Sequence, residues 1–87
     1  MERFSDHRLE EIFHYRLAEG LPRSLCVPAH RTSRLLVAAR AITTLTLFCD
    51  PVLLDGDRLA VHVHGNWHIS FAWDDELGAY QMRLERI

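Results

Sequence analysis

The stretch of residues 59–71 constrains the fold of this chain most, because only one hairpin register gathers its apolar side chains on one face. Apolar residues alternate here with the period of a half-buried β-strand, and Gly65-Asn66 marks a turn. A two-residue loop at Gly65-Asn66 would set polar side chains opposite apolar ones. A three-residue loop from His64 to Asn66 instead pairs Val63 with Trp67, Val61 with Ile69 and Leu59 with Phe71. We therefore predict the three-residue loop and a wholly apolar sheet face.

Two further strands are expected beside this hairpin. Asp55-Gly56 is a tight-turn pair that follows the apolar residues 52–54. The last strand, from residue 79 to about residue 86, also alternates. Its inward side chains are predicted to be Tyr80, Met82 and Leu84, and its outward ones Gln81, Arg83 and Glu85.

The first half of the chain has helical periodicity. Ser5 is the expected N-cap of a first helix, and Gly20 is well placed to end it. Residues 20–27 are expected to form a connection, and Pro28 suits the first turn of a second helix, which Thr43-Thr44 would end. Residues 1–4 fit a short edge strand.

These patterns predict an α+β fold in which two N-terminal helices pack on one face of a small antiparallel β-sheet. A sheet with one apolar face must cover it, and the helices are the available cover. The 87 residues suffice for a single domain, residues 1–87. A hydrophobic content of 48% argues against intrinsic disorder.

Composition also bears on location and partners. The first residues lack the apolar core of a signal peptide, and no apolar run is long enough to span a bilayer, so we expect a cytoplasmic protein. Cys26 and Cys49 are then expected to be reduced thiols. Residues 20–48 carry arginines and no carboxylate, whereas residues 49–87 are rich in acids. A net charge of −2 argues against strong general affinity for nucleic acid, although the basic segment can meet phosphates locally.

The outward sheet face carries the candidate chemistry. In the predicted register His62 and His68 are cross-strand neighbours, with Arg83 and Glu85 on the same face. RNA cleavage by the ribose 2′-hydroxyl needs a base, an acid and a cation for the phosphate. Because imidazole titrates near neutral pH, His62, His68 and Arg83 fit these roles, with Glu85 as an alternative base. The competing interpretation is an ordinary solvated strand face.

Other sites were weighed in the same way. A zinc site made of His62, His64 and His68 is disfavoured, because His64 lies in the turn and no cysteine stands at ligand spacing. No metal or other cofactor is therefore predicted. Arg31, Arg34 and Arg40 are candidate RNA contacts, and the spacing of Arg31 and Arg34 predicts a shared helical face.

Three segments of the chain match a known pattern: AITTL at 41–45, LDGDR at 54–58 and VHVHGNWHISFAW at 61–73. They resemble the HigB toxins of the RelE/ParE superfamily, whose pattern runs roughly A-A-T-S-L, L-x-G-D-R and V-x-V-x-G-x-W-R-I-x-F. The resemblance implies a RelE/ParE-like fold and the toxin component of a type II toxin–antitoxin system. Such toxins are ribosome-dependent mRNA endonucleases, or mRNA interferases, that inhibit translation.

The resemblance also implies partners, namely a cognate helix-turn-helix antitoxin, the ribosome and mRNA. The chain departs from the family at three places. His68 stands where the family has arginine, and the segment between Gly56 and Trp67 is a few residues shorter than in typical members. Residues 83–87 replace a terminal aspartate-tyrosine-histidine type of segment. The family's terminal catalytic residues therefore do not carry over. The alternative to an enzyme is a non-catalytic binding module, either a ParE-like docking inhibitor or a degenerate toxin that binds only its antitoxin.

Overall fold

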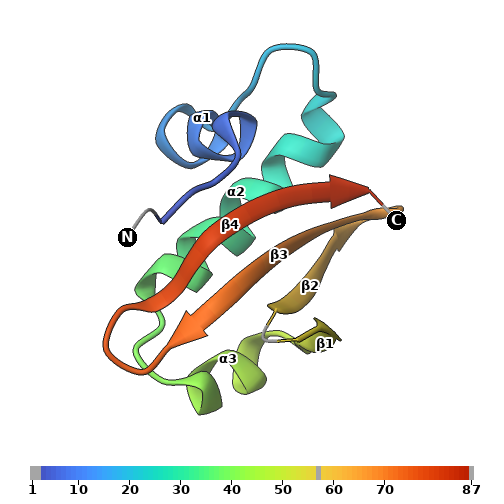
Figure 1. Cartoon of the computed structure of the whole chain (residues 1–87). Helices are drawn as coiled ribbons and strands as arrows, with labels where there is room; N and C mark the ends of the chain where they lie inside the picture. Colours follow the sequence, from blue (N-terminus) through green and yellow to red (C-terminus); the bar gives the residue numbers. More distant parts are fainter. Residues whose placement is uncertain (1–2, 57, 87) are drawn as a thin grey trace.

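The computed structural model describes residues 3–56 and 58–86 of the chain. Within these residues, three helices precede a four-stranded antiparallel sheet: α1 (His7–Tyr15), α2 (Arg23–Ala38), α3 (Ile42–Phe48), β1 (Val52–Asp55), β2 (Arg58–His64), β3 (Trp67–Asp74) and β4 (Gly78–Arg86). The strands pair in chain order, and α1 and α2 pack against one face of the sheet (Figure 1). The predicted α+β class is confirmed, with one more helix than expected.

The first helix begins one residue later and ends earlier than predicted. Its N-cap is Asp6 and not Ser5, since the Asp6 carboxylate accepts a hydrogen bond from the Arg8 amide at 3.0 Å. The same carboxylate accepts from the Leu84 amide at 3.0 Å, which ties the start of α1 to β4. Arg16, in the left-handed conformation at φ 69°, ends the helix before Gly20 is reached.

The second predicted helix is divided in two. α2 begins directly after Pro22, so Pro28 lies inside the helix and not in its first turn. α2 ends because Ala39 is extended at φ −70° and ψ 130°, and α3 follows. The Ala39 carbonyl oxygen lies so close to Gly78 that a Cβ there would be only 3.1 Å away. The division of the helix thus accompanies a tertiary contact that helical periodicity does not reveal.

The central hairpin has the predicted register, with a correction at its end. Leu59 pairs with Phe71, Val61 with Ile69 and His62 with His68. Beyond these pairs the register shifts, so that His64 and not Val63 lies opposite Trp67. The loop therefore has two residues, Gly65 and Asn66, and Val63 forms a bulge. A bulge adds one residue to one strand, which lets a tight turn and a continuous apolar face coexist.

A second bulge changes the face of Tyr80. β4 pairs with β3 through Leu84 and Ile69 and through Tyr80 and Ala72, with an irregularity between. Gln81 has a left-handed φ of 51° at this point. As a result Ala79, Met82 and Leu84 are buried in the core, and Tyr80 shares the outer face with Ala72. The predicted inward position of Tyr80 was wrong.

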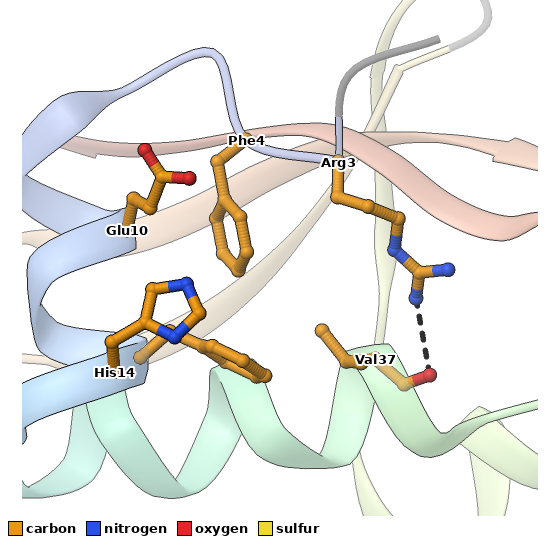
Figure 2. A pocket seen from close by; sticks show the side chains of 6 residues that line it. Arg3, Phe4, Glu10, His14 and Val37 are labelled. Atoms are coloured by element: carbon orange, nitrogen blue, oxygen red, sulfur yellow. Dashed lines mark hydrogen bonds between the residues drawn. The ribbon is translucent and has the colours of Figure 1, made fainter.

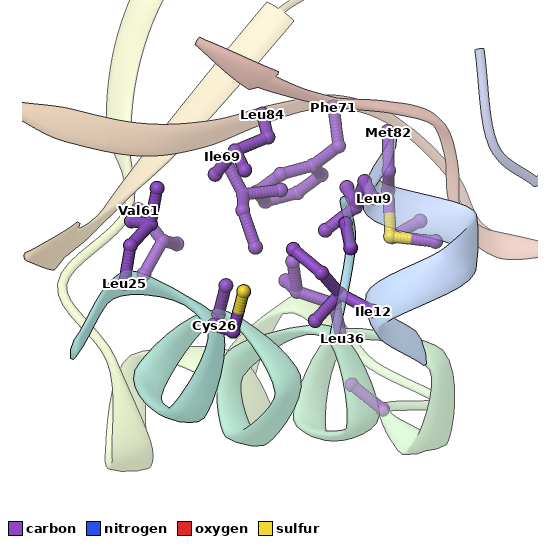
Figure 3. Close-up of a cluster of buried hydrophobic side chains, with 14 of the residues drawn as sticks. Leu9, Ile12, Leu25, Cys26, Leu36, Val61, Ile69, Phe71, Met82 and Leu84 are labelled. Atoms are coloured by element: carbon purple, nitrogen blue, oxygen red, sulfur yellow. The ribbon is translucent and has the colours of Figure 1, made fainter. Parts of the chain in front are cut away.

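The core lies between the sheet and the helices α1 and α2. Figure 3 shows Phe71, Ile69 and Leu84 of the sheet facing helical side chains such as Leu9 and Leu36. Val63 and Trp67, predicted to be buried, are only partly so. Of the predicted edge strand at residues 1–4, Met1 and Glu2 lie outside the described residues, and Phe4 forms a single parallel bridge to Met82.

Two general expectations can be compared with the fold. None of the helices in residues 3–56 and 58–86 has the length and apolar character needed to cross a membrane. Both cysteine thiols are free, with Cys26 buried and Cys49 partly buried.

Candidate functional site

The outer face of β2, β3 and β4 brings the four predicted catalytic residues together. His68 is the central member, because it pairs with His62 of β2 on one side and with Glu85 of β4 on the other. Arg83 pairs with Ser70, two residues further along β3. Since side chains alternate along a strand, these residues share the face that the helices leave free. We call this surface the polar face.

A chain of hydrogen bonds runs across the polar face. Arg58 Nη2 donates to Ser70 Oγ at 3.0 Å, and Ser70 Oγ donates to Glu85 Oε1 at 3.0 Å. The other carboxylate oxygen of Glu85 lies 4.0 Å from His68 Nε2. Ser70 is fully buried, so its hydroxyl both accepts and donates without competition from water. The arrangement fixes the position of the Glu85 carboxylate.

His68 lies deeper than the sequence suggested. It was expected to be displayed on the polar face, but it is only 6% exposed. Its position on β3, between His62 and Glu85 on the neighbouring strands, accounts for this burial. Its Nδ1 is buried and has no hydrogen-bond partner among the described residues. A proton on Nδ1 would have no acceptor, whereas a proton on Nε2 would face the Glu85 carboxylate.

Three groups of the polar face remain open to a substrate. His62 is exposed, and its Nε2 lies 2.9 Å from the Gly65 carbonyl oxygen. Donation from Nε2 to that carbonyl leaves Nδ1 with a free lone pair. Arg83 is exposed, and the Glu85 side chain is 41% exposed. An imidazole, a carboxylate and a guanidinium are thus accessible on one rigid surface.

Arg58 belongs to the polar face, although the sequence argument did not place it among the candidate site residues. Its guanidinium also donates to the Gln81 carbonyl at 2.8 Å, so it joins β2 to β4 across β3. Burial lowers the pKa of Arg58, Arg83 lowers it further, and Glu85 and Tyr80 act in the opposite direction. The sequence could have indicated this position, because strand alternation places Arg58 on the same face as His62.

The three predicted RNA-binding arginines lie apart. Arg31 lines a cavity of about 210 Å³ beside Phe48 and His62, next to the polar face. Arg34 turns the other way and places its guanidinium 4.5 Å from the centre of the Phe13 ring on α1. Arg40 lines a cleft near Glu76 at the β3–β4 turn. Arg31 and Arg34 stand three residues apart on α2, but their side chains contact different segments, Phe48 and His62 for Arg31 and Phe13 of α1 for Arg34.

The described residues form neither a metal site nor an activated thiol. In the part of the chain that the structure describes, no group of three or more histidine, cysteine or acidic side chains could hold a metal ion. Burial raises the pKa of the Cys49 thiol, which disfavours the nucleophilic thiolate.

Comparison with known proteins gives no further information about this site. Neither the protein-family models nor the curated proteins contain a match to this chain. The functional argument therefore depends on the polar face itself.

Proposed function

We propose that this chain is the toxin component of a type II toxin–antitoxin system, a HigB-like member of the RelE/ParE superfamily that cleaves mRNA on the ribosome. The observation that carries the proposal is the convergence of His62, Glu85 and Arg83 on the polar face. Support also comes from the motif resemblance and from the α+β fold. The proposed partners are a helix-turn-helix antitoxin, the ribosome and mRNA, in the cytoplasm.

The proposed reaction is attack of a ribose 2′-hydroxyl on the adjacent phosphodiester. Glu85 takes the 2′-hydroxyl proton, His62 in its protonated form gives a proton to the leaving 5′-oxygen, and Arg83 stabilises the charge on the phosphorus oxygens. His68 and Ser70 hold the Glu85 carboxylate in place and do not exchange protons with the RNA. Arg31, beside His62, is available to a neighbouring phosphate.

This proposal is tested by cleavage of a defined mRNA in a reconstituted translation reaction, with mapping of the new RNA ends. Glu85→Gln and His62→Ala should each slow cleavage about 10²- to 10⁴-fold, the usual contribution of a general acid or base. His64→Ala is the matched control, because His64 is an exposed histidine of the same hairpin that lies outside the polar face. Wild-type rates in the double variant Glu85→Gln/His62→Ala would contradict the assignment.

A second candidate function is a non-catalytic docking inhibitor. It is favoured by an exposed apolar surface on α3 and β1, where Leu47 is 79%, Phe48 68% and Leu53 65% exposed. Large exposed apolar patches are typical of protein-binding surfaces. Growth arrest by the induced wild-type chain, without any new mRNA ends, would support docking over cleavage.

A further inference from the structure

A cavity on the helical side of the molecule lies away from the polar face. It has a volume of about 420 Å³ and opens between the N-terminal segment, α1 and α2, as Figure 2 shows. Its lining residues are Arg3, Phe4, Glu10, Phe13, His14 and Val37. None of these residues takes part in the proposed RNA cleavage.

The apolar part of this cavity has a fixed shape. The rings of Phe4 and Phe13 pack with centroids 5.1 Å apart and a tilt of 50°, and Val37 completes the lining. Arg3 is held at the edge, because it donates to the Val37 carbonyl at 3.1 Å and to the Leu77 carbonyl at 3.0 Å. The cavity therefore offers a preformed space for one aliphatic or aromatic side chain.

Two arginines and a histidine lie beside the cavity. The Arg34 guanidinium covers the Phe13 ring, and Arg34 Nε donates to His30 Nε2 at 3.4 Å. Arg16 is close enough that its charge, like that of Arg34, lowers the pKa of His30, after the larger effect of burial. Because His30 Nε2 acts as an acceptor, the positive charge of this cluster comes from the two guanidiniums. Within residues 3–56 and 58–86, no ion pair joins either arginine to a carboxylate.

Phe13 connects the two features, because its ring lines the cavity and also lies under Arg34. His30, Arg34 and Val37 follow one another on one face of α2, at the helical spacing of four and three residues. The cavity and the cluster of Arg16, His30 and Arg34 thus adjoin each other at Phe13. We call the cavity together with this cluster the α1–α2 groove.

We propose that the α1–α2 groove binds an acidic peptide segment of a partner protein, with one apolar side chain in the cavity and carboxylates against Arg34 and Arg16. The carboxylates would lie outside the cavity, because Glu10 in its lining repels anions there. Apolar burial would supply affinity, and charge complementarity would select the partner. RNA fits less well, because Arg34 already covers a face of Phe13 and closes that face to base stacking. The proposal does not depend on ribonuclease activity.

The test is an amide NMR titration of the full chain with a capped pentapeptide in which leucine stands between two pairs of glutamates. We expect saturable shifts confined to the amides of α1 and α2 around Phe13 and Arg34. The peptide with glycine in place of leucine should bind about tenfold more weakly, since it buries no side chain. The peptide with lysines in place of glutamates should produce no saturable shifts.

Matched variants and a competing ligand complete the test. Arg34→Gln should weaken binding of the leucine peptide about threefold, the effect of one exposed ion pair. Arg31→Gln, which removes a side chain that faces Phe48 and His62 and not Phe13, should bind as wild type does. The proposal is overturned if the leucine peptide gives no saturable shifts, or if the glycine peptide binds equally well, which would indicate a simple anion site. It is also overturned if a hexauridylate shifts the same amides at lower concentration, which would indicate a nucleic-acid surface.

Discussion

Ser70 shows how one small residue organises the polar face. Its buried hydroxyl accepts from Arg58 and donates to Glu85, so both of its strong hydrogen-bonding functions are used. A longer side chain would displace the guanidinium or the carboxylate, and alanine would leave both without this partner. The position of Glu85, which the proposed reaction needs, therefore depends on a serine that has no direct part in proton transfer.

At the same scale, His30 provides a prediction about protonation. Burial, then the charges of Arg34 and Arg16, lower the pKa of His30 from its usual value near 6.5. At a pH between the lowered pKa of the folded state and the usual pKa of the unfolded state, the unfolded chain binds more protons than the folded chain. The free energy of unfolding therefore decreases as the pH falls through that window. In Arg34→Gln, which removes the nearest cation, the pKa of His30 should rise.

The measurement is an NMR titration of the imidazole C–H signals in wild type and in Arg34→Gln. Arg31→Gln serves as the control, because it removes the same charge from a side chain that faces Phe48 and His62, and it should leave the pKa of His30 unchanged. An identical His30 titration in wild type and Arg34→Gln would show that the neighbouring cation does not act on it.

At the scale of elements, two bulges set the geometry of the sheet. The bulge at Val63 allows a two-residue turn while it keeps Val61 opposite Ile69. The bulge at Gln81 lets β4 bury Ala79 at one end and Met82 and Leu84 at the other. It also brings the Gln81 carbonyl within 2.8 Å of Arg58. The bulge at Gln81 therefore shapes the polar face as well as the core.

Gln81 is predicted to destabilise the fold through its backbone conformation. A left-handed φ of 51° costs a residue with a side chain about 1 kcal/mol or more, whereas glycine adopts it readily. Gln81→Gly should therefore raise the free energy of unfolding by about 0.5–1 kcal/mol, measured by urea denaturation. Gln81→Val should lower it, because a β-branched side chain tolerates this conformation least. A glycine variant less stable than wild type would argue against the bulge.

At the scale of the whole molecule, the sheet separates two surfaces of different chemistry. The polar face lies on one side, and the α1–α2 groove lies on the helical side. The fully buried cluster of Phe71, Ile69, Leu9 and Leu36 stands between them. A partner bound in the groove would therefore leave the polar face open, and the two proposals can be tested independently.

This core also gives a prediction about global stability. Phe71 is fully buried, whereas Phe48 is 68% exposed at the end of α3. Phe71→Ala should lower the free energy of unfolding by about 3–5 kcal/mol, and Phe48→Ala should change it by about 0.5 kcal/mol or less. A loss of that size can unfold so small a domain. Phe71→Leu is therefore the milder variant, with an expected loss of about 1 kcal/mol that can be measured in a folded protein. Equal losses at the two phenylalanines would contradict the assigned core.

Local sequence determined the elements that depend on short-range pattern. The alternation at residues 59–71 predicted the strands, the pairing of His62 with His68 and the apolar face, because a one-residue slip would move every side chain to the wrong side. The same argument placed Arg83 and Glu85 beside them. Hydrophobic period and turn residues act over a few positions and can be read along the chain.

Tertiary structure decided what depends on contacts between distant segments. The break between α2 and α3 lies where Ala39 meets Gly78, and the orientation of Tyr80 follows from a bulge in β4. The burial of His68 requires neighbours on both flanking strands. The different surroundings of Arg31 and Arg34 depend on the segments around α2, since Arg34 lies over Phe13 of α1 and Arg31 faces Phe48 of α3. Periodicity assigns a side chain to a face, but the segments packed around it decide whether that face is open to solvent, buried or part of a groove.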